Sequence, residues 1–146
     1  MPKPMLKAVL DTNVLISGVY FPSGTPGQVL ALARKKQIQN ITSPFILEEM
    51  ERILEEKFLW QKARAVQAVR WVRSFSLVVQ PHETLAVVAH ASDNRILECA
   101  LEGGARYLVS GDKHLKQLRR YQGIDILEPR AFLAAIGEGN EDESDR

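Results

Sequence analysis

Short apolar runs alternate along the chain with longer segments in which apolar side chains recur every three or four residues. The short runs predict strands over residues 6–10, 38–42, 77–80, 107–109 and 124–127. The longer segments have the spacing of helices that bury one face. Strands that alternate with helices of these lengths predict one α/β domain built on a doubly wound parallel sheet.

Capping signals mark the starts of two of the predicted helices. Thr25 is followed by Pro26 and then by Gln28, which fits a capping box, and Ser43 is followed by Pro44 in the same way. Further helices are predicted over residues 13–17, 61–74, 93–102 and 113–120, and from residue 129 onward. The pair Gly103 and Gly104 predicts a left-handed end to the fourth of the longer helices.

Two of the predicted strands lead directly into an aspartate. Asp11 follows the first strand, and Asp112 follows the fourth strand after Ser110 and Gly111. Ligands of open α/β sheets bind outside the carboxyl ends of the strands, so both aspartates are candidate site residues. Taken alone, Asp11 is explained equally well as a cap of the helix that follows it.

Two predicted helices bring further acids towards the same end of the sheet. In the helix that begins at Pro44, Glu48 points away from the apolar stripe, whereas Glu49 lies on its flank and can reach the strand ends. That stripe is expected to pack on the sheet, and it consists of Ile46, Leu47, Met50, Ile53 and Leu54. Asp93 begins another helix on its apolar side, although a charge at a helix N-terminus also has a purely structural explanation.

Composition and charge divide the chain into a domain and a tail. The 146 residues are 45% apolar and have a net charge of +1, which fits one globular domain with a core. The last ten residues hold five acids and one arginine, so residues 1–136 carry 18 basic and 13 acidic side chains. We therefore expect a moderately basic domain over residues 1–136 and an acidic disordered tail over residues 137–146.

Basic side chains also line one face of the predicted helix 61–74. Lys62, Arg70 and Arg73 form a stripe that a phosphate backbone can follow. The alternative is that the stripe is simply the solvated face of the helix, which is the more common role of such charges. The stripe is therefore a weak indication of nucleic-acid binding.

The remaining sequence features point to a cytoplasmic chain that does not enter a membrane. Cys99 is the only cysteine, which excludes a disulfide framework and a cysteine-based zinc site. Asp11 interrupts the N-terminal apolar run too early for a secretory signal, and no apolar span of 18 residues follows. The three histidines, His82, His90 and His114, do not have metal-ligand spacing.

Convergence of Asp11, Glu49, Asp93 and Asp112 would have a chemical consequence. At ~5 Å and an effective dielectric of ~20, each pair of carboxylates repels by about 3 kcal/mol, so the site calls for a cation. Carboxylate oxygens in a concave pocket favour Mg²⁺ or Mn²⁺. Such ions can activate water for phosphodiester hydrolysis, and no protein nucleophile is then required.

Four short motifs resemble those of a known family. They are D-T-N at 11–13, S-P-x-x-L-x-E at 43–49, D-N-x-x-L-E at 93–98 and S-G-D at 110–112. In this order they are similar to the motifs of PIN-domain ribonucleases, in particular the prokaryotic branch described as toxins of toxin–antitoxin pairs. The resemblance covers residues 5–136.

The resemblance implies a fold, a site and an activity. It implies a five-stranded parallel sheet in the order 3-2-1-4-5 with helices on both faces. Asp11, Glu49, Asp93 and Asp112 would form the catalytic and metal-binding site, with Asn13 and Ser110 as polar helpers. The expected activity is Mg²⁺- or Mn²⁺-dependent cleavage of single-stranded RNA by a homodimer, with a separate antitoxin protein as partner.

One departure from the family pattern and two alternatives remain. Similar proteins often carry Asp-Pro before the third acidic motif, whereas this chain has His90-Ala91-Ser92, which removes an accessory acid and puts metal affinity in question. A non-catalytic PIN-like module that binds RNA or a protein is one alternative. A phosphoacceptor signalling domain is disfavoured, because Asp11 stands alone at its strand end instead of in an acidic pair.

Overall fold

A central sheet of six strands runs in the order β3-β2-β1-β4-β6-β5 through the computed structural model, which describes residues 5–144 and the side chains of residues 5–137. The first five positions in this order confirm the predicted parallel sheet. These strands are β3 (Ser76–Val78), β2 (Ile38–Thr42), β1 (Leu6–Leu10), β4 (Tyr107–Val109) and β6 (Ile124–Leu127).

The sixth strand, β5 (Arg120–Tyr121), was not predicted. It pairs antiparallel with β6 at the edge of the sheet. The two residues between these strands, Gln122 and Gly123, have φ values of 46° and 82°. Positive φ at both positions suits a tight hairpin turn, which explains how so short a strand forms here.

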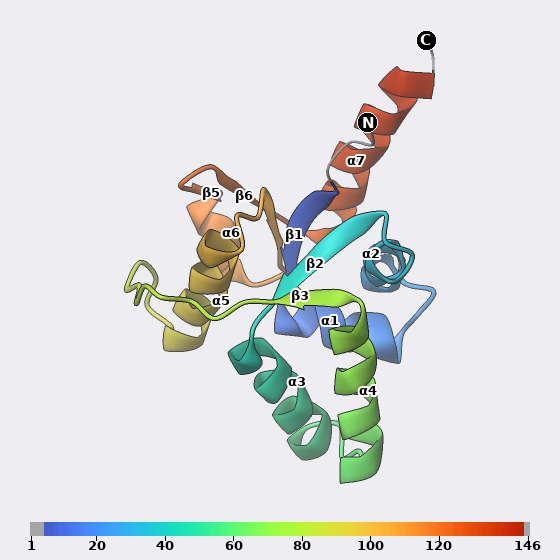
Figure 1. Cartoon of the computed structure of the whole chain (residues 1–146), viewed down its shortest axis with the longest axis vertical. Coiled ribbons are helices and arrows are strands. Elements are labelled where there is room, and N and C mark those ends of the chain that lie inside the picture. The colour runs from blue at the N-terminus through green and yellow to red at the C-terminus, as the bar shows by residue number, and fades with distance from the viewer. Residues whose placement is uncertain (1–4, 145–146) are drawn as a thin grey trace.

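Seven helices surround the sheet in the part of the chain that the structure describes, and they cover both of its faces as expected (Figure 1). Helices α1, α2 and α7 lie on one side, and α5 and α6 lie on the other. Their bounds are α1 (Thr12–Tyr20), α2 (Thr25–Arg34), α3 (Pro44–Glu56), α4 (Lys62–Ser74), α5 (Ala91–Glu102), α6 (Lys113–Leu118) and α7 (Pro129–Ser144).

Two helix starts differ from the capping signals, and a third agrees with them. Gly24 is the N-cap of α2 and no side chain caps this helix, so the capping box assigned to Thr25 is wrong. Helix α5 begins at Ala91 with His90 as its N-cap, two residues earlier than expected. Ser43 caps α3 as predicted, because its Oγ accepts a hydrogen bond from the backbone N–H of Ile46 at 3.3 Å.

Two helix ends also lie beyond their predicted positions. Helix α1 continues past Ser17 to Tyr20 and so includes Gly18. A Cβ on Gly18 would come within 2.9 Å of Leu30 Cδ2 on α2, so this glycine allows α2 to pack closely and does not end the helix. Helix α7 continues to Ser144, into the segment 137–146 where we expected a disordered tail. The division of the chain at residue 136 stays a prediction.

Helix α3 packs differently from the prediction. Four of its five stripe residues are buried and the fifth, Ile53, is partly buried. However, the main contacts of α3 are with α1, α4 and α5, and not with the sheet. The apolar stripe therefore holds α3 against other helices, and Glu49 reaches the end of the sheet from this second layer.

The core lies on both faces of the sheet. Ala8, Val9 and Leu10 of β1 are fully buried, as are Leu108 and Val109 of β4. Burial on both faces is typical of the central strands of a parallel sheet covered by helices. Among the described residues, no helix is both long and apolar enough to span a membrane.

Candidate functional site

All four predicted acids line one pocket of about 350 Å³. Asp11 and Asp112 come from the ends of β1 and β4, Asp93 comes from the first turn of α5, and Glu49 comes from α3. Asp11 and Asp93 are buried, Glu49 is half-buried, and Glu48 is exposed. The choice of Glu49 over Glu48 as the residue that faces the site agrees with this geometry.

Ser110 joins two of the acids. Its hydroxyl donates a hydrogen bond to Asp11 Oδ2 at 2.7 Å and accepts one from the backbone N–H of Asp112 at 3.0 Å. Ser110 is fully buried, and the backbone N–H of Asp11 donates to Val109 O at 3.0 Å. Hydrogen bonds at Val109 and at Ser110 therefore join the end of β4 to the end of β1.

Asp112 is also a helix cap. Its Oδ1 accepts hydrogen bonds from the backbone N–H groups of His114 at 2.9 Å and Leu115 at 3.1 Å. These bonds satisfy two free donors at the start of α6 and orient the carboxylate. Within the described residues Oδ2 makes no hydrogen bond, so this oxygen remains for a ligand.

Thr12 is a site residue that the sequence reasoning missed. Its hydroxyl donates a hydrogen bond to Glu49 Oε1 at 2.6 Å, and its side chain is buried. The bond joins the first turn of α1 to α3 and fixes the acid that comes from the second layer. Thr12 lies inside the D-T-N motif, but the sequence gives no sign that its hydroxyl faces a residue 37 positions away.

The auxiliary residues lie at different distances from the pocket. Asn13 is exposed and lines the pocket, and it also lines a neighbouring cavity. Lys62, Arg70 and Arg73 are exposed on α4 and do not line the pocket. Lys62 lies 4.0 Å from Glu51.

Burial and charge raise the pKa of two acids of the pocket, Asp11 and Asp93. Burial raises the pKa of Asp11 to about 6, although its hydrogen bonds from Ser110 and from the backbone of Thr12 oppose this shift. Burial also raises the pKa of Asp93, and the charge of Asp112 adds to the effect. These two aspartates therefore keep their protons to a higher pH than exposed aspartates do, as expected for buried acids near other carboxylates.

Two histidines meet at the same pocket although 24 positions separate them in sequence. The rings of His90 and His114 have centroids 4.5 Å apart, and both residues line the pocket. Both histidines lower the pKa of Asp93 and so partly offset its burial. His90 lies in the His90-Ala91-Ser92 segment, where similar proteins often carry Asp-Pro. An imidazole therefore lines the pocket in the part of the sequence that departs from the family pattern.

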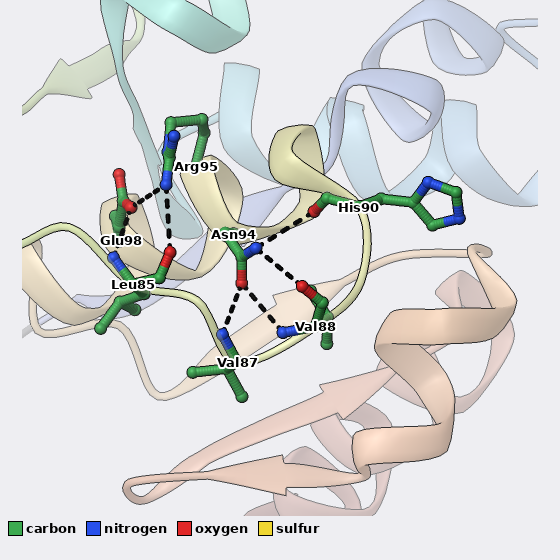
Figure 2. Close-up of polar contacts among 7 residues, drawn as sticks. All are labelled: Leu85, Val87, Val88, His90, Asn94, Arg95 and Glu98. Atoms are coloured by element: carbon green, nitrogen blue, oxygen red, sulfur yellow. Dashed lines mark hydrogen bonds and ion pairs between the residues drawn. The ribbon is translucent and has the colours of Figure 1, made fainter.

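Helix α5 also holds the segment that leads into it (Figure 2). The side chain of Asn94 accepts from the backbone N–H groups of Val87 and Val88 and donates to the carbonyls of Val88 and His90, at 2.8–3.3 Å. Glu98 accepts from the backbone N–H of Leu85 at 2.8 Å. We call residues 85–90 the clamped segment; it ends at His90, beside the pocket.

The donor set of the pocket fits a hard divalent cation. In the part of the chain that the structure describes, the four acids form no ion pair with lysine or arginine, which leaves their charge available to a ligand. No three acidic, histidine or cysteine side chains among the described residues form a ready-made coordination site. Mg²⁺ does not need one, because it binds proteins through one or two carboxylates and keeps several waters.

Comparison with solved structures places this fold among known ones. VapBC2 from Rickettsia felis, bound to a DNA fragment from its promoter, aligns with 84% of this chain and 98% of that chain at a TM-score of 0.59 and 16% identity. VapBC-1 from nontypeable Haemophilus influenzae aligns with 86% of this chain and 99% of that chain, with a TM-score of 0.59 and 17% identity. At these identities the likeness concerns the fold.

Sequence comparison identifies the family. Uncharacterized protein MJ1680 from Methanocaldococcus jannaschii is 35% identical over 123 residues, which span 82% of this chain and 79% of that protein. The PIN domain family profile matches residues 7–114, a range that includes all four acids, all of β2, β3 and β4, and β1 except for its first residue. On this evidence the chain belongs to the PIN domain family.

Proposed function

We propose that this chain is a metal-dependent endoribonuclease that hydrolyses single-stranded RNA, and that Asp11, Glu49, Asp93 and Asp112 form its catalytic, metal-binding site. The observation that carries the proposal is the convergence of these acids, from four separate elements, on one pocket at the carboxyl end of the sheet. Membership of the PIN domain family supports a nuclease. The metal is Mg²⁺ or Mn²⁺, in keeping with the oxygen donors.

Hydrolysis needs little covalent chemistry from the protein. The oxygen of a water molecule bonds to phosphorus, the bond from phosphorus to the leaving ribose oxygen breaks, and a proton ends on that oxygen. When bound, Mg²⁺ or Mn²⁺ supplies positive charge to the scissile phosphate and makes water a better nucleophile. No side chain of the pocket bonds to phosphorus in this scheme.

The chain's own residues then have positioning roles. Ser110 holds Asp11 and Asp112 in register, and Thr12 holds Glu49. Asp112 is oriented further by the backbone of α6. Catalytic groups held in this way lose little entropy when substrate binds, which is the main contribution that a rigid site makes.

Two neighbouring glutamates on α3 give the sharpest test. Glu49→Gln should lower Mn²⁺-dependent cleavage of a mixed panel of single-stranded RNAs by at least about 100-fold, a typical loss when a charged group is removed from a preorganised site. Glu48→Gln, one position away and exposed, should cleave as the unchanged protein does. Asp11→Asn and Asp112→Asn should behave like Glu49→Gln, and EDTA should abolish all cleavage.

Equal activity of the Glu49 and Glu48 variants would refute the assigned site. A different result would favour the binding module: no cleavage by the unchanged chain with any metal, together with retained binding of the same RNAs. In that case the acids would serve recognition and not hydrolysis.

We also propose that the chain acts in the cytoplasm as the toxin of a toxin–antitoxin pair and forms a homodimer. The fold shared with the two VapBC structures supports the first part. An exposed aromatic cluster supports the second: the Tyr20 ring lies 5.0 Å from Phe58, and Leu59 beside it is 82% exposed with a φ of 57°. Exposed apolar clusters of this kind mark interaction surfaces. Sedimentation of the purified chain tests the dimer.

A further inference from the structure

We call the pocket lined by Asp11, Glu49, Asp93 and Asp112 the acid pocket. A second cavity, of about 340 Å³, lies beside it. Asn13 lines both cavities. Gly111, which also lines the second cavity, immediately precedes Asp112 of the acid pocket. The two cavities are therefore neighbours that share the exposed side chain of Asn13.

The lining of this second cavity combines flat apolar surface with a few polar groups. Val14, Pro26 and Pro129 supply the apolar part. Asn13, Ser17 and Thr25 supply an amide and two hydroxyls. Pockets of this size with a small number of polar groups bind partly apolar molecules and fix their orientation by hydrogen bonds.

Opposite charges lie together at the edge of this cavity. Glu128 lines the cavity, but its carboxylate is paired with Lys116, which also lowers the pKa of Glu128. Arg130 also lines the cavity, and its charge likewise lowers the pKa of Glu128. The charged side chains that line this cavity therefore balance, whereas four acids line the acid pocket together with Arg52 and Lys57.

We propose that this second cavity, which we call the base pocket, binds the nucleobase of a nucleotide next to the phosphodiester cleaved in the acid pocket. This inference rests on the proposed ribonuclease function. A base has apolar faces and hydrogen-bonding edges, which match Val14 and Pro26 on the one hand and Asn13, Ser17 and Thr25 on the other. The base pocket would give the enzyme its preference at one position of the RNA.

The position of the second cavity next to the acid pocket is the reason to assign a base to it. A single-stranded RNA whose phosphate lies among the acids presents an unstacked base on each side of that phosphate. The base pocket shares Asn13 with the acid pocket, and its Gly111 directly precedes Asp112, so it is the neighbouring cavity that one of these bases would enter. Arg130 would contact the phosphate that follows that base.

The test combines removal of a base with filling of the base pocket. The substrates are single-stranded RNA oligonucleotides of one sequence, each with one abasic nucleotide at a different position. With the unchanged protein, one abasic position next to the cut should lower cleavage by about tenfold, the effect of one base contact. In Ser17→Leu the same abasic nucleotide should change cleavage less than twofold, because the leucine already fills the space.

Two further variants control this experiment. Thr25→Leu fills the base pocket from α2 and should act like Ser17→Leu if that variant folds poorly. Ser74→Leu makes the same chemical change at an exposed position on α4 and should keep the tenfold effect. Thermal unfolding of all three variants checks that each is folded.

The outcomes separate the base pocket from the proposed function. An abasic effect that is the same in Ser17→Leu as in the unchanged protein overturns the base pocket but leaves the ribonuclease intact. If the unchanged protein cleaves none of the RNAs, the proposed ribonuclease function is wrong, and binding of the same oligonucleotides is then measured by anisotropy titration in EDTA. Binding that depends on the base and that Ser17→Leu removes supports the base pocket. Binding that does not depend on the base overturns it. Loss of a protein partner alone in Ser17→Leu would assign the cavity to that partner, against the inference.

Discussion

Asp11 is the most deeply placed acid of the pocket, with 3% of its surface exposed and a pKa raised to about 6. An unfolded chain releases the same proton near pH 3.8. Between these values the unfolded state loses the proton first, so the stability of the metal-free protein falls as pH rises from 4 to 6. Above pH 6 Asp11 is ionised in both states, and the free energy of unfolding stays lower by the full cost of its buried charge. A shift of two pKa units corresponds to about 3 kcal/mol.

Asp11→Asn should therefore stabilise the metal-free protein at pH 7.5, by up to about 3 kcal/mol, and should give no gain at pH 4. Thermal unfolding in EDTA at both pH values measures the difference. Asp125→Asn is the control, because Asp125 is paired with Arg120 at 3.4 Å and its replacement should not raise the melting temperature. An Asp11→Asn protein less stable than the unchanged one at pH 7.5 would contradict the assignment of the penalty.

Thr12 permits a test of positioning that keeps every acid. Thr12→Val preserves the shape of the side chain but removes the hydroxyl that donates to Glu49, whereas Thr12→Ser keeps the donor. The valine variant should need about tenfold more Mn²⁺ for half-maximal cleavage, as is typical when a group that orients a metal ligand is removed. The serine variant should match the unchanged protein, and equal Mn²⁺ dependence in both variants would argue against the role of Thr12.

At the scale of elements, α5 performs two tasks with adjacent residues. Asp93 faces the acid pocket, while Asn94 and Glu98 hold the clamped segment. Asn94 is buried and makes four hydrogen bonds with its two acceptor and two donor sites, so its amide is fully satisfied. Helix α5 therefore fixes the clamped segment next to Asp93, the acid that the same helix contributes to the acid pocket.

Asn94→Ala should lower the free energy of unfolding by about 2–4 kcal/mol, because each hydrogen bond contributes about 1 kcal/mol. Hydrogen exchange should become faster at the amides of Val87 and Val88, which lose their acceptor. Denaturant unfolding and exchange mass spectrometry measure the two effects. Gln67→Ala, at an exposed position on α4, should change neither; an unchanged exchange rate in Asn94→Ala would show that the clamp is not needed.

The basic side chains of α4 lie away from the pocket, and their replacement tests whether they contact RNA. Replacement of Lys62, Arg70 and Arg73 by Gln should reduce the slope of log affinity against log salt by about 2, since each phosphate contact contributes about 0.7 for single strands. The same change at Arg34, Lys35 and Lys36, an exposed basic cluster at the end of α2, provides the control. Equal slopes for both triple variants would assign the stripe on α4 to solvent.

Across the whole molecule, the elements that depend on local pattern were predictable. Apolar runs located the five parallel strands, and helical spacing located all seven helices. Apart from the starts of α2 and α5, the errors concern features that the sequence pattern does not reveal. Gly18 looks like the end of a helix until Leu30 is known to pack on it, and β5 is too short to produce a pattern.

The site divides in the same way. A carboxylate after a strand, on the flank of an apolar stripe or at the start of a helix is visible in the sequence, and these positions pointed to the four acids that line one pocket. Thr12, which orients Glu49, was missed because the contact spans distant residues. The contact between His90 and His114 at the pocket was missed for the same reason. A hydroxyl or an imidazole leaves no periodic signal, because one such residue changes neither amphipathicity nor turn chemistry.

The position of β4 has a consequence for synthesis of the protein. This strand lies between β1 and β6, and Ser110 at its end joins Asp11 to Asp112. A nascent chain that has not yet delivered β4 lacks Asp112 and the hydrogen bonds that hold Asp11, whatever else has folded. About three quarters of the chain must therefore be synthesised before the acid pocket can form, so translation itself would delay the ribonuclease activity proposed above.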